Sequence, residues 1–152
     1  MANKKLTGDL GEILCAKFLP KIFGEKSIVI RTGSENYPFD LLVIPSNKNK
    51  RPTLISVKTR SKVKNIPYSV FKDIKNINKN FGTWVGLVLL GESDTSFGIY
   101  FLPLEELEKC RKTNYTTKPP EFRTQDIILK AKELKLSFES KKFEIKKFRE
   151  SL

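Results

Sequence analysis

The apolar run at residues 84–90, with the sequence WVGLVLL, constrains the fold more than any other segment of the chain. A strand that is apolar at every position must be covered on both faces, whereas a strand with one solvated face alternates apolar and polar residues. The run is too short to cross a bilayer, which takes about 20 apolar residues in a helix. It therefore predicts a central strand in a sheet with helices on both sides.

The flanking sequence supplies further elements for this sheet. Residues 7–19 have the apolar spacing of a helix, with Thr7 as its cap and Pro20 at its end. Strands are predicted at residues 27–32, 39–44, 53–60 and 97–102, and helices at 67–80, at 104–112 and from Thr124 onward. The resulting order, αβββαββ followed by C-terminal helices, is an α/β (α+β) arrangement. We expect a core at 1–112 and, at 113–152, a helical extension packed on the same domain.

Positive charge is abundant and unevenly distributed. The formal net charge is +12, and no Asp or Glu occurs between residues 41 and 72. Segregated charge of this kind creates a local field that attracts polyanions, with nucleic acid as the first candidate. A basic scaffold for an acidic protein or a membrane surface is the alternative, although no amphipathic basic helix supports a membrane partner. Because no signal peptide or spanning segment is seen, we expect a soluble, intracellular (cytoplasmic) protein.

The chain contains no histidine, and this excludes whole classes of mechanism. Neither a Ser-His-Asp nor a Cys-His nucleophile is possible. Cys15 and Cys110 lie far apart without a CxxC partner, so neither a disulfide framework nor a zinc ribbon is indicated. Metal chemistry would have to use carboxylates, which favour Mg²⁺ or Mn²⁺.

Three charged residues occur in an order that suggests an active site. Glu12 lies on the first predicted helix, Asp40 in the otherwise apolar strand FDLLVI, and Lys58 late in the next strand, TLISVKTR. If these two strands are antiparallel neighbours, Asp40 and Lys58 reach the same end of the sheet. A carboxylate beside a lysine at that position is costly unless it has a function.

The segments GDLGEILCAKFL, YPFDLLVIP and LISVKTR resemble the PD-(D/E)XK nuclease superfamily, and among its members archaeal Holliday junction resolvases and related small endonucleases. The resemblance covers about residues 7–90 and implies a restriction-endonuclease-like fold. It also implies a metal-dependent endodeoxyribonuclease, directed to junctions or to specific sites as in homing endonucleases. Asp40, Glu12 and the backbone carbonyl of Val57 would bind Mg²⁺ (or Mn²⁺), and Lys58 would orient or deprotonate the attacking water.

One position departs from the family pattern. The acid expected two residues before Lys58 is replaced by Ser56, which removes a negative charge from the site. Either Glu12 takes over this role, with Glu35 as a weaker substitute, or the chain is a catalytically inactive nuclease fold that only binds DNA or RNA. Ser56 remains a candidate site residue under both hypotheses.

The basic residues would then contact DNA. A homodimer, or a higher homo-oligomer, is expected because cutting two strands requires two sites. Tyr37, Phe39 and Tyr68 are candidates for stacking on splayed bases. The predicted phosphate contacts are Arg31, Ser34, Lys48, Lys50, Arg51, Arg60, Lys62 and Lys64.

Overall fold

The computed structural model describes residues 4–32, 38–60, 66–67, 80–91, 96–110 and 121–140. Within these ranges six strands form one sheet of order β1-β2-β3-β5-β6-β8, and β4 pairs with β7. The helices are α1 (Lys4–Phe18), α2 (Pro20–Phe23), α3 (Leu104–Lys109) and α4 (Thr124–Glu133). The strands are β1 (Ile28–Arg31), β2 (Leu41–Ile44), β3 (Thr53–Arg60), β4 (Ile66–Pro67), β5 (Gly82–Leu90), β6 (Phe97–Pro103), β7 (Glu121–Phe122) and β8 (Ser137–Glu139).

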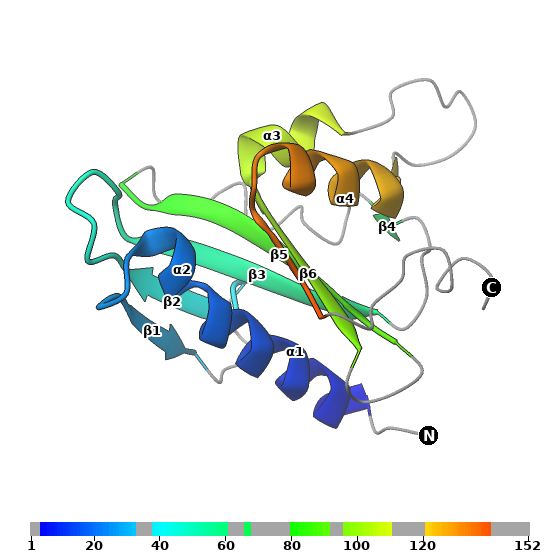
Figure 1. Ribbon diagram of the computed structural model, residues 1–152, viewed down its shortest axis with the longest axis horizontal. Coiled ribbons are helices and arrows are strands. Elements are labelled where there is room, and N and C mark those ends of the chain that lie inside the picture. Colours follow the sequence, from blue (N-terminus) through cyan, green and yellow to red (C-terminus); the bar gives the residue numbers. More distant parts are fainter. Residues whose placement is uncertain are drawn as a thin grey trace.

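The main sheet is mixed. Strands β1, β2 and β3 form an antiparallel meander, whereas β5 runs parallel to β3 with Leu87 opposite Lys58. Strands β6 and β8 continue the sheet in antiparallel pairing. With helices on both faces, this arrangement confirms the predicted fold class, a mixed central sheet flanked by helices (Figure 1).

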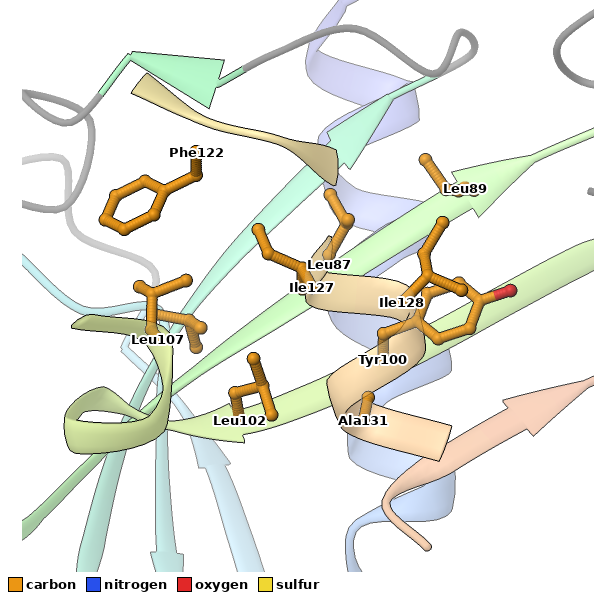
Figure 2. Close-up of a cluster of buried hydrophobic side chains, with 10 residues drawn as sticks. Leu87, Leu89, Tyr100, Leu102, Leu107, Phe122, Ile127, Ile128 and Ala131 are labelled. Atoms are coloured by element: carbon orange, nitrogen blue, oxygen red, sulfur yellow. The ribbon is translucent and has the colours of Figure 1, made fainter. Parts of the chain in front are cut away.

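Two hydrophobic clusters cover the two faces of β5, as its apolar sequence predicted. On one face, α1 and α2 pack Cys15, Leu19 and Phe23 against strand residues that include Ile55 and Val88. On the other face, α3 and α4 cover the sheet. Figure 2 shows Ile127, Ile128 and Ala131 of α4 directed toward Leu87 and Tyr100 of the strands. The central strand is therefore buried on both sides.

Several predicted boundaries were wrong. Helix α1 begins at Lys4, so Thr7 lies inside the helix and is not its cap. Pro67, predicted to start a helix, belongs to β4, and most of that predicted helix lies outside the described residues. Strand β8 falls where the C-terminal extension was expected to be helical, because its pairing with β6 replaces a helical turn.

Gly11 allows α1 to approach β3 closely. A Cβ at position 11 would collide with Thr59 Oγ1 on the facing strand. No other residue fits this contact without moving the helix or the strand. The adjacent residue is Glu12, so the same close approach fixes the position of a predicted site residue.

We predict that Gly11→Ala lowers the free energy of unfolding by about 1–3 kcal/mol, because overpacking outweighs the gain in helix propensity. Gly8→Ala, on the same helix with open space around the new Cβ, is the matched control. It should stabilise by roughly 0.5–1 kcal/mol. Urea unfolding of both variants tests this expectation, and equal effects at the two positions would contradict it.

Candidate active site

Asp40 lies immediately before β2 and continues the pairing of that strand with β3. Its N–H donates to the carbonyl of Ile55 (2.9 Å), and its own carbonyl accepts from Thr32 N–H (3.0 Å). Two residues beyond Ile55 along β3, the N–H of Val57 donates to Asp40 Oδ2 at 2.7 Å. The carboxylate thus occupies the place where the next carbonyl of a β-ladder would lie. Asp40 therefore sits at the end of the β2–β3 ladder, with its carboxylate against the edge of β3.

The carbonyl of Val57 points toward the same edge. In a strand, the N–H and C=O of one residue face the same neighbouring strand. Because the N–H of Val57 meets Asp40, its carbonyl is directed to the side where β2 has ended. A carboxylate and a backbone carbonyl are thus placed together by main-chain geometry.

Ser56 and Lys58 share one face of β3. Leu41 pairs with Ile55 at the start of β2, and Ser56 and Lys58 follow in β3 beyond this last paired residue. Ser56 is 3% exposed, whereas Lys58 is only partly buried. Since Ile55 and Val57 face α1, Ser56 and Lys58 face the opposite side of the sheet. The amine of Lys58 has no ion-pair partner within the described part of the chain.

Glu12 approaches this edge from the α1 face. It is partly buried, with 20% of its side chain exposed, and accepts hydrogen bonds from Arg31 at 3.4 Å. Arg31 donates to Asp9 more closely, at 3.0 Å. Arg31 comes from β1 beside β2, so it connects the sheet to two carboxylates of α1. Sequence reasoning did not identify Asp9, and assigned Arg31 only to DNA.

The charge of Asp40 acts on the protonation equilibrium of Glu12. Burial, followed by repulsion from Asp40, raises the pKa of Glu12 above its usual value, although Arg31 acts in the opposite direction. The buried thiol of Cys15 is influenced by the same two residues, Asp40 and Glu12. Burial raises the pKa of its thiol, and the charges of Asp40 and Glu12 add to this effect. Both carboxylates therefore act on one small region between α1 and the end of β2.

The donor set suits a hard divalent cation that keeps several water ligands. Magnesium sites commonly use one or two carboxylates with water, and here Asp40, Glu12 and the Val57 carbonyl supply oxygen donors. The repulsion between the two carboxylates is an electrostatic cost that a bound cation would offset. The described residues contain no cluster of three or more Cys, Asp and Glu side chains arranged to hold a metal ion.

The predicted DNA contacts do not form one surface. Lys50 and Arg51 precede β3, whereas Arg60 ends it, and a strand of this length separates its ends by more than about 20 Å. Arg60 Nη1 donates to the carbonyl of Thr59. Lys48 is exposed in the same loop as Lys50. Six residues singled out from the sequence lie outside the described residues: Ser34, Glu35, Tyr37, Lys62, Lys64 and Tyr68.

Neither a membrane span nor a disulfide is found where the structure is described. No helix among these residues is both long and apolar enough to cross a bilayer. Cys15 and Cys110 are both free thiols, as their spacing predicted. Phe39, a candidate for base stacking, is partly buried next to Asp40.

The chain is similar in backbone arrangement to nucleases of known structure. No protein-family model and no curated protein sequence matches it. One similar structure is Hjc, a Holliday junction resolvase from Archaeoglobus fulgidus, with 14% identity, a TM-score of 0.45, and coverage of 78% of this chain and 98% of Hjc. Another is a restriction endonuclease in complex with substrate DNA, with 17% identity, a TM-score of 0.44, and coverage of 91% and 71%. Both likenesses are remote.

We predict that Glu12→Gln stabilises the protein at neutral pH. A raised carboxyl pKa means that folding favours the neutral form, so this stability is present at low pH and lost as pH rises through the folded pKa. Glutamine keeps the neutral form at every pH. Unfolding free energies of the parent and variant should diverge above about pH 4.3 and converge below it.

Glu25→Gln, at an exposed position beyond α2, is the control for this measurement. A stability gain for Glu12→Gln that is independent of pH would contradict the electrostatic origin. So would a loss of stability at neutral pH, which would make the Arg31 pair the dominant interaction.

Proposed function

We propose that this chain is a metal-dependent endodeoxyribonuclease, with its active site at the end of β2. The observation that carries the proposal is the hydrogen bond from the Val57 N–H to the Asp40 carboxylate, which places a carboxylate against the edge of β3, the strand that carries Lys58. The net charge of +12 supports a polyanionic substrate. The absence of histidine leaves carboxylates and lysine as the groups that can perform phosphodiester hydrolysis.

Each residue has a role that follows from its position. Asp40 and Glu12 would hold Mg²⁺ or Mn²⁺ together with the Val57 carbonyl, and the Val57 N–H fixes the orientation of the Asp40 carboxylate. Lys58 would orient the attacking water and stabilise negative charge on the phosphate. When bound, the metal would lower the pKa of a water and offset the charge of the phosphate. Arg31 holds Glu12 in place from β1.

DNA would approach along the C-terminal end of β3. Arg60 belongs to this end, and Lys62 and Lys64 follow it in the sequence, so they are the proposed phosphate contacts nearest to Lys58. A homodimer is proposed because cleavage of two strands requires two such sites. The cleavage assay compares four-way-junction DNA with linear and supercoiled duplexes and so identifies the preferred substrate.

We predict that Asp40→Asn and Lys58→Met each lower the rate of DNA cleavage by on the order of 100-fold. Asn at position 40 still accepts the Val57 hydrogen bond, so the variant removes charge with little change in structure. Labelled supercoiled, linear and four-way-junction DNA, with Mg²⁺ or Mn²⁺, are the substrates. DNA binding, measured in parallel, should persist.

Lys26→Met, at an exposed lysine in the turn after α2, controls for loss of positive charge. It should leave cleavage unchanged. Full activity in both Asp40→Asn and Lys58→Met would refute the assignment of the site, and equal loss in the Lys26 control would point to a general charge effect.

The second candidate function is a nuclease fold that binds DNA or RNA without cutting it. Ser56 favours this alternative because it stands where the family pattern has an acid, and serine brings no negative charge to that position. Ser56 is nearly fully buried, which leaves little room for a flexible substitute ligand.

Ser56→Asp tests the two functions against each other. If the parent cleaves DNA, the added carboxylate should lower the Mg²⁺ concentration needed for half-maximal rate by about tenfold, because a third charged ligand strengthens the site. If the parent only binds, the variant should gain metal-dependent cleavage. Ser56→Asn, similar in size and uncharged, is the control. If Ser56→Asp and Ser56→Asn needed the same Mg²⁺ concentration for half-maximal rate, a role for charge at position 56 would be contradicted.

A further inference from the structure

A second concave site lies at the other end of the sheet from Asp40. It is a hollow of about 770 Å³, within the range of roughly 300–1,000 Å³ typical of small-molecule sites. Its walls come from α2, the loop before β3, the start of β5 and the start of α3. We call it the Trp84 pocket, and its main lining residues are Phe23, Lys50, Arg51, Trp84, Glu105 and Glu108.

One wall of the Trp84 pocket combines an aromatic surface with a cation. The rings of Phe23 and Trp84 lie 5.0 Å apart between centroids. The Lys50 ammonium lies 5.4 Å from the Phe23 centroid and 5.8 Å from that of Trp84. Phe23 is buried and Trp84 is partly exposed, so Trp84 is the ring available to a ligand. A flat ring against Trp84 would place an attached anionic group near Lys50.

The opposite wall carries carboxylates. Glu105 in the first turn of α3 and Glu108 near its end line the same hollow. A pocket that bound phosphate alone would be lined by cationic side chains without carboxylates. Carboxylates accept hydrogen bonds from exocyclic amino groups of bases, such as that of cytosine, and from sugar hydroxyls. The two walls together match a ligand with a flat polar ring and a phosphate.

We propose that the Trp84 pocket binds an unpaired nucleotide, with its base against Trp84 and its phosphate near Lys50. The choice of nucleic acid as ligand rests in part on the proposed function, whereas binding here does not require cleavage. Thr53 to Lys58 spans about 17 Å along β3, at about 3.3 Å per residue. A strand that keeps the stacked spacing of duplex DNA, about 3.4 Å per step, would cross this distance in roughly five steps. A single-stranded flank of a substrate that is bound at Asp40 would therefore reach the pocket.

The intrinsic fluorescence of the chain reports on this pocket alone, because Trp84 is its single tryptophan. The full chain is titrated without metal with deoxycytidine monophosphate and with a six-nucleotide deoxycytidine strand. We expect saturable quenching by the strand. Quenching by the monophosphate as well would mean that a free nucleotide is accepted, whereas quenching by the strand alone would assign the ligand to single-stranded DNA.

Lys50→Glu should weaken binding by about tenfold, since it removes a charged contact to phosphate. Lys21→Ala is the matched control, because Lys21 also lies over an aromatic ring, that of Phe18, but outside the pocket. It should leave the quenching curve unchanged. Absence of quenching, or equal quenching in Lys50→Glu, would overturn the proposal. Since no metal is present, this result is independent of whether Asp40 and Lys58 support cleavage.

Discussion

The hydrogen bond from Val57 N–H to the Asp40 carboxylate determines the rest of the site. A side chain here replaces a main-chain carbonyl, so the β2–β3 ladder ends while β3 continues for three more residues, to Arg60. The exposed edge of β3 then presents the Val57 carbonyl beside a carboxylate. A buried N–H without a hydrogen-bond partner would destabilise the fold. Because the acceptor here is the carboxylate of Asp40, this hydrogen bond is stronger than one to a neutral carbonyl. Structure and proposed chemistry depend on the same pair of atoms.

Glu12 shows how a site can be assembled at some expense of stability. Burial and Asp40 both disfavour its charged form, and Arg31 offsets only part of this effect. Its position follows from Gly11, because contact of the helix backbone with Thr59 leaves Glu12 at the sheet edge. An exposed carboxylate would be easier to ionise but would lie too far from Asp40 to share a cation. The raised pKa is thus a consequence of the close packing that brings the two carboxylates together.

The sequence predicted elements with strong local patterns and failed where pairing is decided by distant residues. Strand β3 was located at its observed bounds because apolar and polar positions alternate. Strand β5 was found because its apolar run requires cover on both faces, although it begins at Gly82, two residues before that run. Strand β8 has three residues and exists through its pairing with β6, which no local pattern encodes. For the site, the positions of Glu12 and Asp40 were proposed from family resemblance. The Arg31 pairs with Asp9 and Glu12 join positions about 20 residues apart and required the structure.

The antiparallel meander also has a consequence for the order of folding. Strands β1, β2 and β3 are joined by short connections, and their pairing needs no residue beyond position 60. By contrast, the pairing of β5 with β3 joins residues that are farther apart in the sequence: Lys58 and its partner Leu87 are separated by 29 positions. Loop closure costs more entropy as the separation grows, so the local meander is expected to form first. Asp40 and Val57 would then be joined before the parallel half of the sheet docks, and the candidate site would serve as an early nucleus of the fold.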